Sequence, residues 1–352
     1  MRTAKLESVM LPRRPGERFI TAFTKLVGVE HPIALAPMGG VVESDLAAAV
    51  GNAGGYPIMP LSWSGQDIIE TELQSLRAKT NAPFAVNLCL DMPQDARLEH
   101  SLSYKPNAVH FFWGDAAPYV TRVHAHGALV IQTVSDSEEA KRAVAAGVDV
   151  LVAQGWEAGG HVRSTIATMS LLPAVADVAG SVPVLAAGGI SDGRGLAAAL
   201  CLGASGAVMG TRFLATPESA AHKDYIARLI AADHGDTLVE TDLYNVGWPN
   251  AQHRVLRNAL AARWLAEGRP DNTSRHRAGE TVAQRGEARI RTYQSTTPHR
   301  EMTGEIEAMS MWAGQSVGLV NTIEPAGAIV ERVTDEARTI LRSTSLDSAS
   351  GV

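Results

Sequence analysis

The chain has 352 residues, of which 45% are hydrophobic and 19% charged, so it can bury a large core and is not a disordered protein. Its formal net charge of −6 argues against binding to nucleic acid or to an anionic membrane as the main function. Two cysteines, Cys89 and Cys201, provide neither a disulfide framework nor a metal site. Without a signal peptide or a run of about 18 apolar residues, we expect a cytoplasmic protein.

Eight short apolar runs alternate with helical segments before about residue 212. The runs are apolar on both faces, as in a parallel sheet that helices cover on both sides. Helix-starting residues such as Asp136 and Asp192 lie between them. This alternation predicts an α/β fold, and eight regular units favour a (β/α)8 TIM barrel over a doubly wound sheet. The runs are Ile33–Pro37, Tyr56–Pro60, Phe84–Leu88, Ala108–Phe112, Ala128–Gln132, Val148–Ala153, Pro183–Ala187 and Gly206–Met209.

The pattern changes after Phe213. Residues 250–300 contain ten arginines, no lysine and four acids, a net charge of +6. We interpret residues 216–311 as a mainly helical cap inserted before the last barrel helix, and residues 1–215 with 312–345 as the barrel. Residues 346–352 read as a flexible tail. The arginines indicate either a solvated surface docked on an acidic barrel or a rim that meets an anionic ligand.

Two glycine-containing loops follow the seventh and eighth predicted strands, where TIM barrels commonly bind phosphate. Gly188 and Gly189 let backbone N–H groups approach a phosphate closely, and a helix begins just beyond them. Gly210 and Thr211 offer a second amide and a hydroxyl. A glycine pair alone also serves any tight turn, but two such loops at the two expected positions predict a phosphate site.

Uncharged residues end several of the other strands, and three of them are amides. Pro37, Met38 and Gly39 end the first strand, and three amides, Asn87, Gln132 and Gln154, end the third, fifth and sixth. Amides both donate and accept hydrogen bonds, which suits the edge of a planar heterocycle such as an isoalloxazine. Together with the phosphate site, they favour flavin mononucleotide (FMN) as the cofactor, although each amide alone has a structural explanation.

His161 is the candidate catalytic residue. It follows Gly159 and Gly160 in the loop after the sixth strand, which can bring it close to the cofactor. Imidazole is the side chain best suited to proton transfer near neutral pH.

These segments carry a family resemblance. VAQGWEAGGHV at residues 152–162 and VPVLAAGGISDGRGLAAALCLGASGAVMGTRF at residues 182–213 resemble the nitronate monooxygenases, formerly called 2-nitropropane dioxygenases. HPIALAPM, FAVNL, GWPNAQHRVLRN and AGQSVGL extend the resemblance over nearly the whole chain. It implies an FMN barrel that oxidises alkyl nitronates with O₂ to a carbonyl compound and nitrite, with His161 as base or orienting group. The flavin contacts that it implies are Met38, Asn87, Gln154, Gly159, Gly188, Met209, Gly210 and Thr211.

Two features bear on how far the resemblance extends. Arg163 stands where the family usually has glycine, and could narrow the pocket or bind an anion. Relatives also include enoyl reductases and quinone reductases, some with ECAGH and a lysine near the position of Gln132, so EAGGH and Gln132 favour the monooxygenase. An NAD(P)H-dependent reductase of an enoyl thioester or quinone is the alternative. A flavin carrier or sensor without turnover, a flavin-free phosphate-sugar barrel and a homo-oligomer stay open.

Overall fold

The computed structural model describes residues 18–344 and contains a barrel of eight parallel strands. The strands follow the order β1-β9-β8-β6-β5-β4-β3-β2, and β1 closes the ring on β2 through a bridge between Ala34 and Tyr56. The predicted TIM barrel is therefore confirmed. The strands are β1 Ile33–Leu35, β2 Ile58–Pro60, β3 Ala85–Cys89, β4 Ala108–Phe112, β5 Leu129–Val134, β6 Val150–Gln154, β8 Val184–Ala187 and β9 Gly206–Met209.

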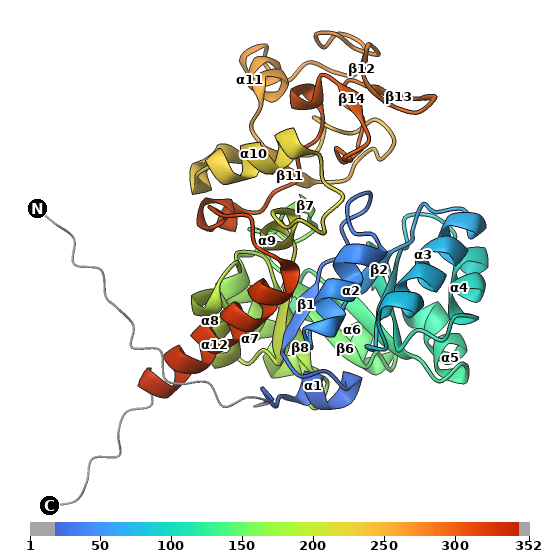
Figure 1. Cartoon of the computed structure of the whole chain (residues 1–352), viewed down its shortest axis with the longest axis vertical. Helices are drawn as coiled ribbons and strands as arrows, with labels where there is room; N and C mark the ends of the chain where they lie inside the picture. Colours follow the sequence, from blue (N-terminus) through green and yellow to red (C-terminus); the bar gives the residue numbers. More distant parts are fainter. Residues whose placement is uncertain (1–17, 345–352) are drawn as a thin grey trace, which may run out of the picture.

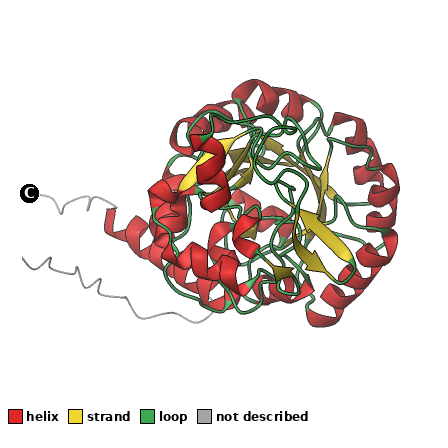
Figure 2. Ribbon diagram, turned by 90° about the horizontal axis from the view of Figure 1, so that it is seen from above, coloured by secondary structure: helices red, strands yellow, loops and turns green. Residues whose placement is uncertain are grey.

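Helices surround the barrel, as the view from above shows (Figure 2). Two of them begin where the sequence indicated: Asp136 accepts a hydrogen bond from the Glu139 N–H, and Asp192 accepts from the N–H groups of Arg194 and Gly195. The helix α1, Ala22–Val27, lies at the end away from the insertion (Figure 1). The surrounding helices are α2 Ser44–Asn52, α3 Gln66–Lys79, α4 Asp95–Leu102, α5 Ala117–Ala125, α6 Ser137–Ala145, α7 Thr168–Ala179, α8 Gly193–Cys201 and α12 Ala326–Thr344.

The strands bury both faces, and their side chains alternate between two cores. Side chains such as Ile131 and Leu185 fill the barrel interior, while neighbours such as Val130 and Ala186 pack against the helices. The inward positions turn polar only near the carboxyl ends of the strands, as at Asn87. This arrangement leaves a packed floor beneath a polar mouth.

The insertion between β9 and α12 stacks over one end of the barrel (Figure 1). The expectation that it is mainly helical is wrong, because it combines two helices of moderate length with two small antiparallel sheets. The β12–β13 hairpin turns at Gly286, whose φ of +56° suits glycine. The residues that flank this turn are mostly polar, which allows the two strands to be exposed to water. Its elements are α9 Thr211–Leu214, α10 Lys223–Ala231, η1 His234–Asp236, β10 Thr237–Glu240, β11 His253–Leu256, α11 Ala259–Ala266, β12 Thr281–Arg285, β13 Ala288–Arg291, β14 Thr303–Gly304, η2 Ile306–Ala308 and η3 Gln315–Leu319.

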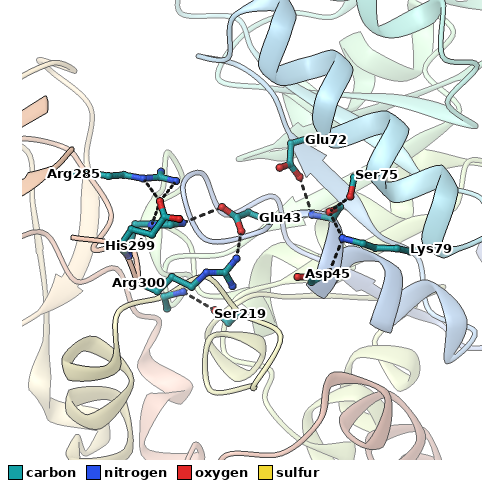
Figure 3. Close-up of polar contacts among 12 residues, drawn as sticks. Glu43, Asp45, Glu72, Ser75, Lys79, Ser219, Arg285, His299 and Arg300 are labelled. Carbon is teal, nitrogen blue, oxygen red and sulfur yellow. Dashed lines mark hydrogen bonds and ion pairs between the residues drawn. The ribbon is translucent and has the colours of Figure 1, made fainter. Parts of the chain in front are cut away.

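A polar cluster joins the insertion to the loop between β1 and α2 (Figure 3). The Glu43 carboxylate accepts a hydrogen bond from buried His299 Nε2 at 3.0 Å and pairs with Arg300 at 2.5 Å. Nearby, Arg285 pairs with Glu301 at 2.8 Å. The bond from His299 lowers the pKa of Glu43, so this carboxylate stays charged where it holds the insertion.

Within residues 18–344, no helix is long and apolar enough to cross a lipid bilayer. The predicted tail, residues 346–352, lies outside the described part of the chain.

Candidate active site

A cavity of about 600 Å³ lies at the carboxyl ends of the barrel strands, with the insertion forming its other wall. This is the end of a TIM barrel where active sites are found. The structure brings twelve of the sequence-predicted site residues to its walls. They are Pro37, Met38, Gly39, Asn87, Gln154, Gly159, Gly160, His161, Gly188, Gly189, Gly210 and Thr211.

Gln132 and Met209 do not line this cavity. Both point outward from their strands, since side chains alternate and the neighbouring Thr133 and Val208 point inward. The Gln132 Oε1 accepts a hydrogen bond from the Ala116 N–H at 3.1 Å, and the Met209 side chain packs in the core between strands and helices. Sequence reasoning placed both residues on the right strands but on the wrong face.

His161 forms part of the cavity wall in the short strand β7, Gly160–His161. This strand pairs with β11, and Gln154 Nε2 donates to the His161 carbonyl at 3.1 Å. The Nε2 atom of His161 is buried and has no hydrogen-bond partner among the described residues. Burial, with a smaller contribution from His253, lowers the pKa of His161 to about 3, so its ring is neutral at physiological pH. A neutral imidazole offers one donor and one acceptor.

Indole rings enclose the His161 side chain. The ring centroid of Trp248 lies 3.9 Å away, that of Trp312 lies 5.1 Å away, and that of Trp113 lies 5.9 Å away edge-on. Trp248 also contacts Trp63, which comes from the barrel loop after β2, with ring centroids 5.1 Å apart. Apolar walls exclude water from the ring and strengthen polar interactions there.

His110 and Thr133 are two of the cavity residues that the sequence analysis missed. On β4, His110 is the inward register partner of Asn87, and on β5, Thr133 is the next inward position beyond Ile131, the partner of His110. His110 Nδ1 lies 3.2 Å from Asn87 Nδ2, and His110 Nε2 lies 2.7 Å from Thr133 Oγ1. A sequence signal was present: residues 87, 110 and 133 are 23 positions apart, and each is a polar residue within or at the end of an apolar run.

The glycine loops have backbone conformations that require glycine. Gly188 and Gly189 have φ values of +105° and +77°, which L side chains rarely adopt. A Cβ atom on Gly159 would lie 2.4 Å from the backbone nitrogen of Gly314. Thr211 Oγ1 accepts a hydrogen bond from the Gly314 N–H at 3.0 Å. Backbone and hydroxyl groups thus come close together beside the amides, a donor set that fits a flavin with a phosphate.

Arg163 does not line the cavity. Its guanidinium bonds the carboxylate of Glu139 on α6 at 2.5 Å, and the side chain of Glu139 is largely buried. The departure from the family's glycine therefore ties the His161 loop to a barrel helix rather than narrowing the pocket.

Most arginines of residues 250–300 make structural contacts, either within the insertion or between the insertion and the barrel loops. Arg254 donates to the Trp156 carbonyl, Arg275 donates to the Leu243 carbonyl, and others pair with carboxylates. Arg285 is the one arginine of this segment that lines the cavity, and it is also paired. These contacts favour the first of the two interpretations of this charge, a solvated and structural surface.

The sequence of this chain matches a family model and the sequences of known proteins over much of its length. The family model for nitronate monooxygenase matches residues 21–115 and 92–336. A nitronate monooxygenase from Pseudomonas aeruginosa is 32% identical over 368 residues, covering 90% of this chain and 99% of that protein. A (3aS,4S,5R,7aS)-5-hydroxy-7a-methyl-1-oxo-octahydro-1H-indene-4-carboxyl-CoA dehydrogenase from Mycobacterium tuberculosis is 38% identical over 246 residues, covering 69% of this chain and 68% of that protein.

Two solved structures share the fold of this chain over nearly its whole length. A FabK from Thermotoga maritima has a TM-score of 0.76 at 31% identity, over 92% of this chain and 98% of that one. A nitroalkane oxidase from Streptomyces ansochromogenes has a TM-score of 0.73 at 28% identity, over 92% of this chain and 100% of that one. With its barrel, its cavity and these matches, the chain is an oxidoreductase that belongs to the nitronate monooxygenase family.

Proposed function

We propose that this enzyme binds FMN and oxidises alkyl nitronates with O₂ to a carbonyl compound and nitrite. The observation that carries the proposal is the unpartnered, buried Nε2 of His161 in an apolar wall of the cavity. A buried polar atom without a partner is costly, so such atoms often mark the place where a ligand binds. The full-length similarity to a nitronate monooxygenase supports the same substrate class.

The glycine loops and amides are the groups proposed to hold FMN. Gly188, Gly189 and Thr211 would surround the phosphate, and Asn87 and Gln154 would face the ring edge. When bound, FMN supplies the electron transfer between nitronate and O₂, while the protein supplies binding and orientation.

His161 would handle the substrate. Its neutral ring can accept the α-proton of a nitroalkane at one nitrogen, or donate a hydrogen bond to a nitronate oxygen. The depressed pKa makes it a weak base, so orientation of a preformed nitronate is its better-supported role. The indoles of Trp248 and Trp312 keep this encounter out of water.

The test measures O₂ uptake and nitrite release with propyl-2-nitronate, alongside a control with NADPH alone. Nitrite formed with O₂ consumed, and a silent control, are expected. Because an orienting group acts on the nitronate whichever substrate is supplied, we expect His161→Asn to reduce turnover of neutral 2-nitropropane and of the preformed nitronate to a similar extent. A much larger loss on 2-nitropropane would show that His161 also acts as the base that removes the α-proton. Absence of nitrite would contradict the proposed reaction.

A second candidate is oxidoreduction of a CoA thioester, with NAD(P)H as electron donor in the reductive direction. It is favoured by the similarity to dehydrogenases of a carboxyl-CoA from Mycobacterium tuberculosis and Rhodococcus jostii. Arg289 and Arg291 lie on β13, which pairs with β12, and Arg285 at the end of β12 lines the cavity. In this second candidate function, the two arginines would bind the phosphates of CoA or NAD(P)H. Rapid anaerobic bleaching of the flavin by NADPH or by an acyl-CoA, without nitrite formation, would favour this function.

A further inference from the structure

Three neighbouring strands place a row of polar side chains on the cavity wall. Asn87 on β3 and His110 on β4 are register partners that face inward, Thr133 on β5 faces inward two residues beyond Ile131, the partner of His110, and all three are buried. Their contacts form a continuous chain, from Asn87 Nδ2 to His110 Nδ1 at 3.2 Å and from His110 Nε2 to Thr133 Oγ1 at 2.7 Å. The proposed roles of Asn87 and His161 give no function to His110 or to Thr133.

One acceptor, the main-chain carbonyl of His110, determines the direction of the hydrogen bonds that link Asn87, His110 and Thr133. Asn87 Nδ2 also lies 3.2 Å from the main-chain carbonyl of His110, and a carbonyl oxygen can only accept. The atom that faces it must therefore be the NH₂ group of Asn87. The opposite assignment would set two oxygens against each other.

The same NH₂ group fixes the tautomer of His110. Because it can only donate, His110 Nδ1 accepts, and the ring proton of the neutral imidazole is on Nε2. Burial lowers the pKa of His110 to about 3, which keeps the ring in this singly protonated form at physiological pH. The Nε2–H then donates to Thr133 Oγ1.

The Thr133 hydroxyl is left with its own proton to donate. It already accepts from His110, and among the residues that the structure describes no acceptor bonds this proton. Thr133 lines the cavity, so a ligand there can accept the bond. Inside a barrel, such an unused donor is costly unless a ligand accepts from it.

We infer that Thr133 is a hydrogen-bond donor to an acceptor atom of the flavin ring system, and that His110 is a positioning residue that fixes the direction of this bond. The acceptor class is a ring carbonyl oxygen or an unprotonated ring nitrogen. The inference rests on the proposed function only in taking the ligand to be a flavin. It assigns no substrate contact to either residue.

The test uses the full chain from which the flavin has been removed. FMN is added back, its affinity is measured by fluorescence quenching, and the visible absorption bands of the bound flavin are recorded. Thr133→Val removes the donor and is expected to weaken FMN binding about 2- to 10-fold and to shift the bands. Thr133→Ser keeps the hydroxyl and is expected to retain both properties. Thr334→Val is the matched control, because its buried hydroxyl bonds the Val330 carbonyl within α12, away from the cavity.

Variants of His110 test the positioning role. His110→Gln carries an N–H near the position of Nε2 and is expected to preserve the absorption bands. His110→Asn lacks this donor and is expected to reproduce part of the Thr133→Val shift. In the Thr133→Val background, His110→Asn should cause no further change in FMN affinity, because the two residues act through one bond.

Each outcome has a separate meaning. Unchanged affinity and bands in Thr133→Val would overturn the donor role while leaving FMN as the cofactor. Full additivity of His110→Asn and Thr133→Val would overturn the positioning role. If the wild-type chain bound no FMN, both this inference and the proposed function would be overturned. Circular dichroism melts of each variant separate these results from misfolding.

Discussion

His161 lies against three indole rings, and this contact determines its charge. Its pKa is lowered to about 3, far below the ordinary value near 6.5, because the charged ring would be held away from water. A catalytic histidine with an ordinary pKa would lose activity as the pH falls below about 6.5. Here the ring stays neutral over that range.

We therefore predict no loss of activity from protonation of His161 between pH 8 and pH 5. The measurement is kcat/KM for a nitronate across this range, corrected for the fraction of substrate present as nitronate. His161→Asn should lower the whole profile without changing its shape. An acidic limb near pH 6.5 that disappears in His161→Asn would show that the ring titrates normally.

Single residues were predictable from the sequence where a motif surrounds them. Gly188, Gly189 and His161 lie in segments whose glycines indicate loops at the barrel mouth, and the structure brings them to one cavity. Gln132 and Thr133 could not be told apart, because one position along a strand reverses the face. The face on which a strand residue lies depends on how the strand pairs with its neighbours. This pairing involves residues far apart in the sequence, so a local motif does not reveal it.

At the scale of elements, the loop before α2 and the insertion meet at Glu43. Its carboxylate binds His299 and Arg300 at once, so the insertion is attached to the barrel by a partly buried charged group (Figure 3). The lowered pKa of Glu43 means that this stabilisation is fully present above about pH 4.5. It is lost as the pH falls through the folded-state pKa of Glu43.

We predict that Glu43→Gln lowers the free energy of unfolding by about 1 kcal/mol at pH 7, because a charge-assisted bond and an ion pair are weakened together. Thermal and urea unfolding measure the change. Glu138→Gln is the matched control, since Glu138 forms an exposed pair with Lys141 on α6. Equal effects of the two substitutions would show that Glu43 is an ordinary surface charge.

The insertion was harder to predict than the barrel helices. Its two longer helices, α10 and α11, carry apolar positions, but its strands are short and polar, as in β12 and β13. Strand β7 has only two residues, Gly160 and His161, and it exists because β11 pairs with it. Local propensity cannot reveal a strand that its partner creates.

At the scale of the whole molecule, buried neutral histidines couple stability to pH. His110 and His161 each have a pKa of about 3 in the folded chain, against about 6.5 when unfolded. Between these values the unfolded chain binds more protons, so the free energy of unfolding falls as the pH falls. At pH 5 the loss is about 2 kcal/mol for each histidine.

We predict that urea unfolding will show this loss between pH 7.5 and pH 5, and that His110→Gln will reduce it by about 2 kcal/mol. The comparison uses the difference between the two pH values, so a general destabilisation by the substitution cancels. An identical pH dependence in the variant and the wild type would contradict the buried, neutral state of His110.

The barrel itself could be predicted from the sequence because its signal repeats. Each of the eight runs lies within two residues or so of an observed strand, as Ala108–Phe112 shows for β4. Because eight similar strand–helix units indicate the same fold, an error in the bounds of one strand does not change the prediction. The insertion contains no such repeated unit, so an error in predicting one of its elements is not corrected by the others. The cavity followed from the barrel, since strand ends converge there.

The last helix, α12, lies across the place where the first and last barrel units meet. It packs on both α2 and α8, and its Glu336 carboxylate accepts a hydrogen bond from the Gly193 N–H at the start of α8. During synthesis, the ribosome releases this helix only after the whole insertion has emerged. Until then the nascent barrel exposes the apolar faces of α2 and α8, the state in which a chain is most open to misassembly. A chain that ended before Ala326 would keep every residue of the cavity but leave that part of the barrel wall uncovered.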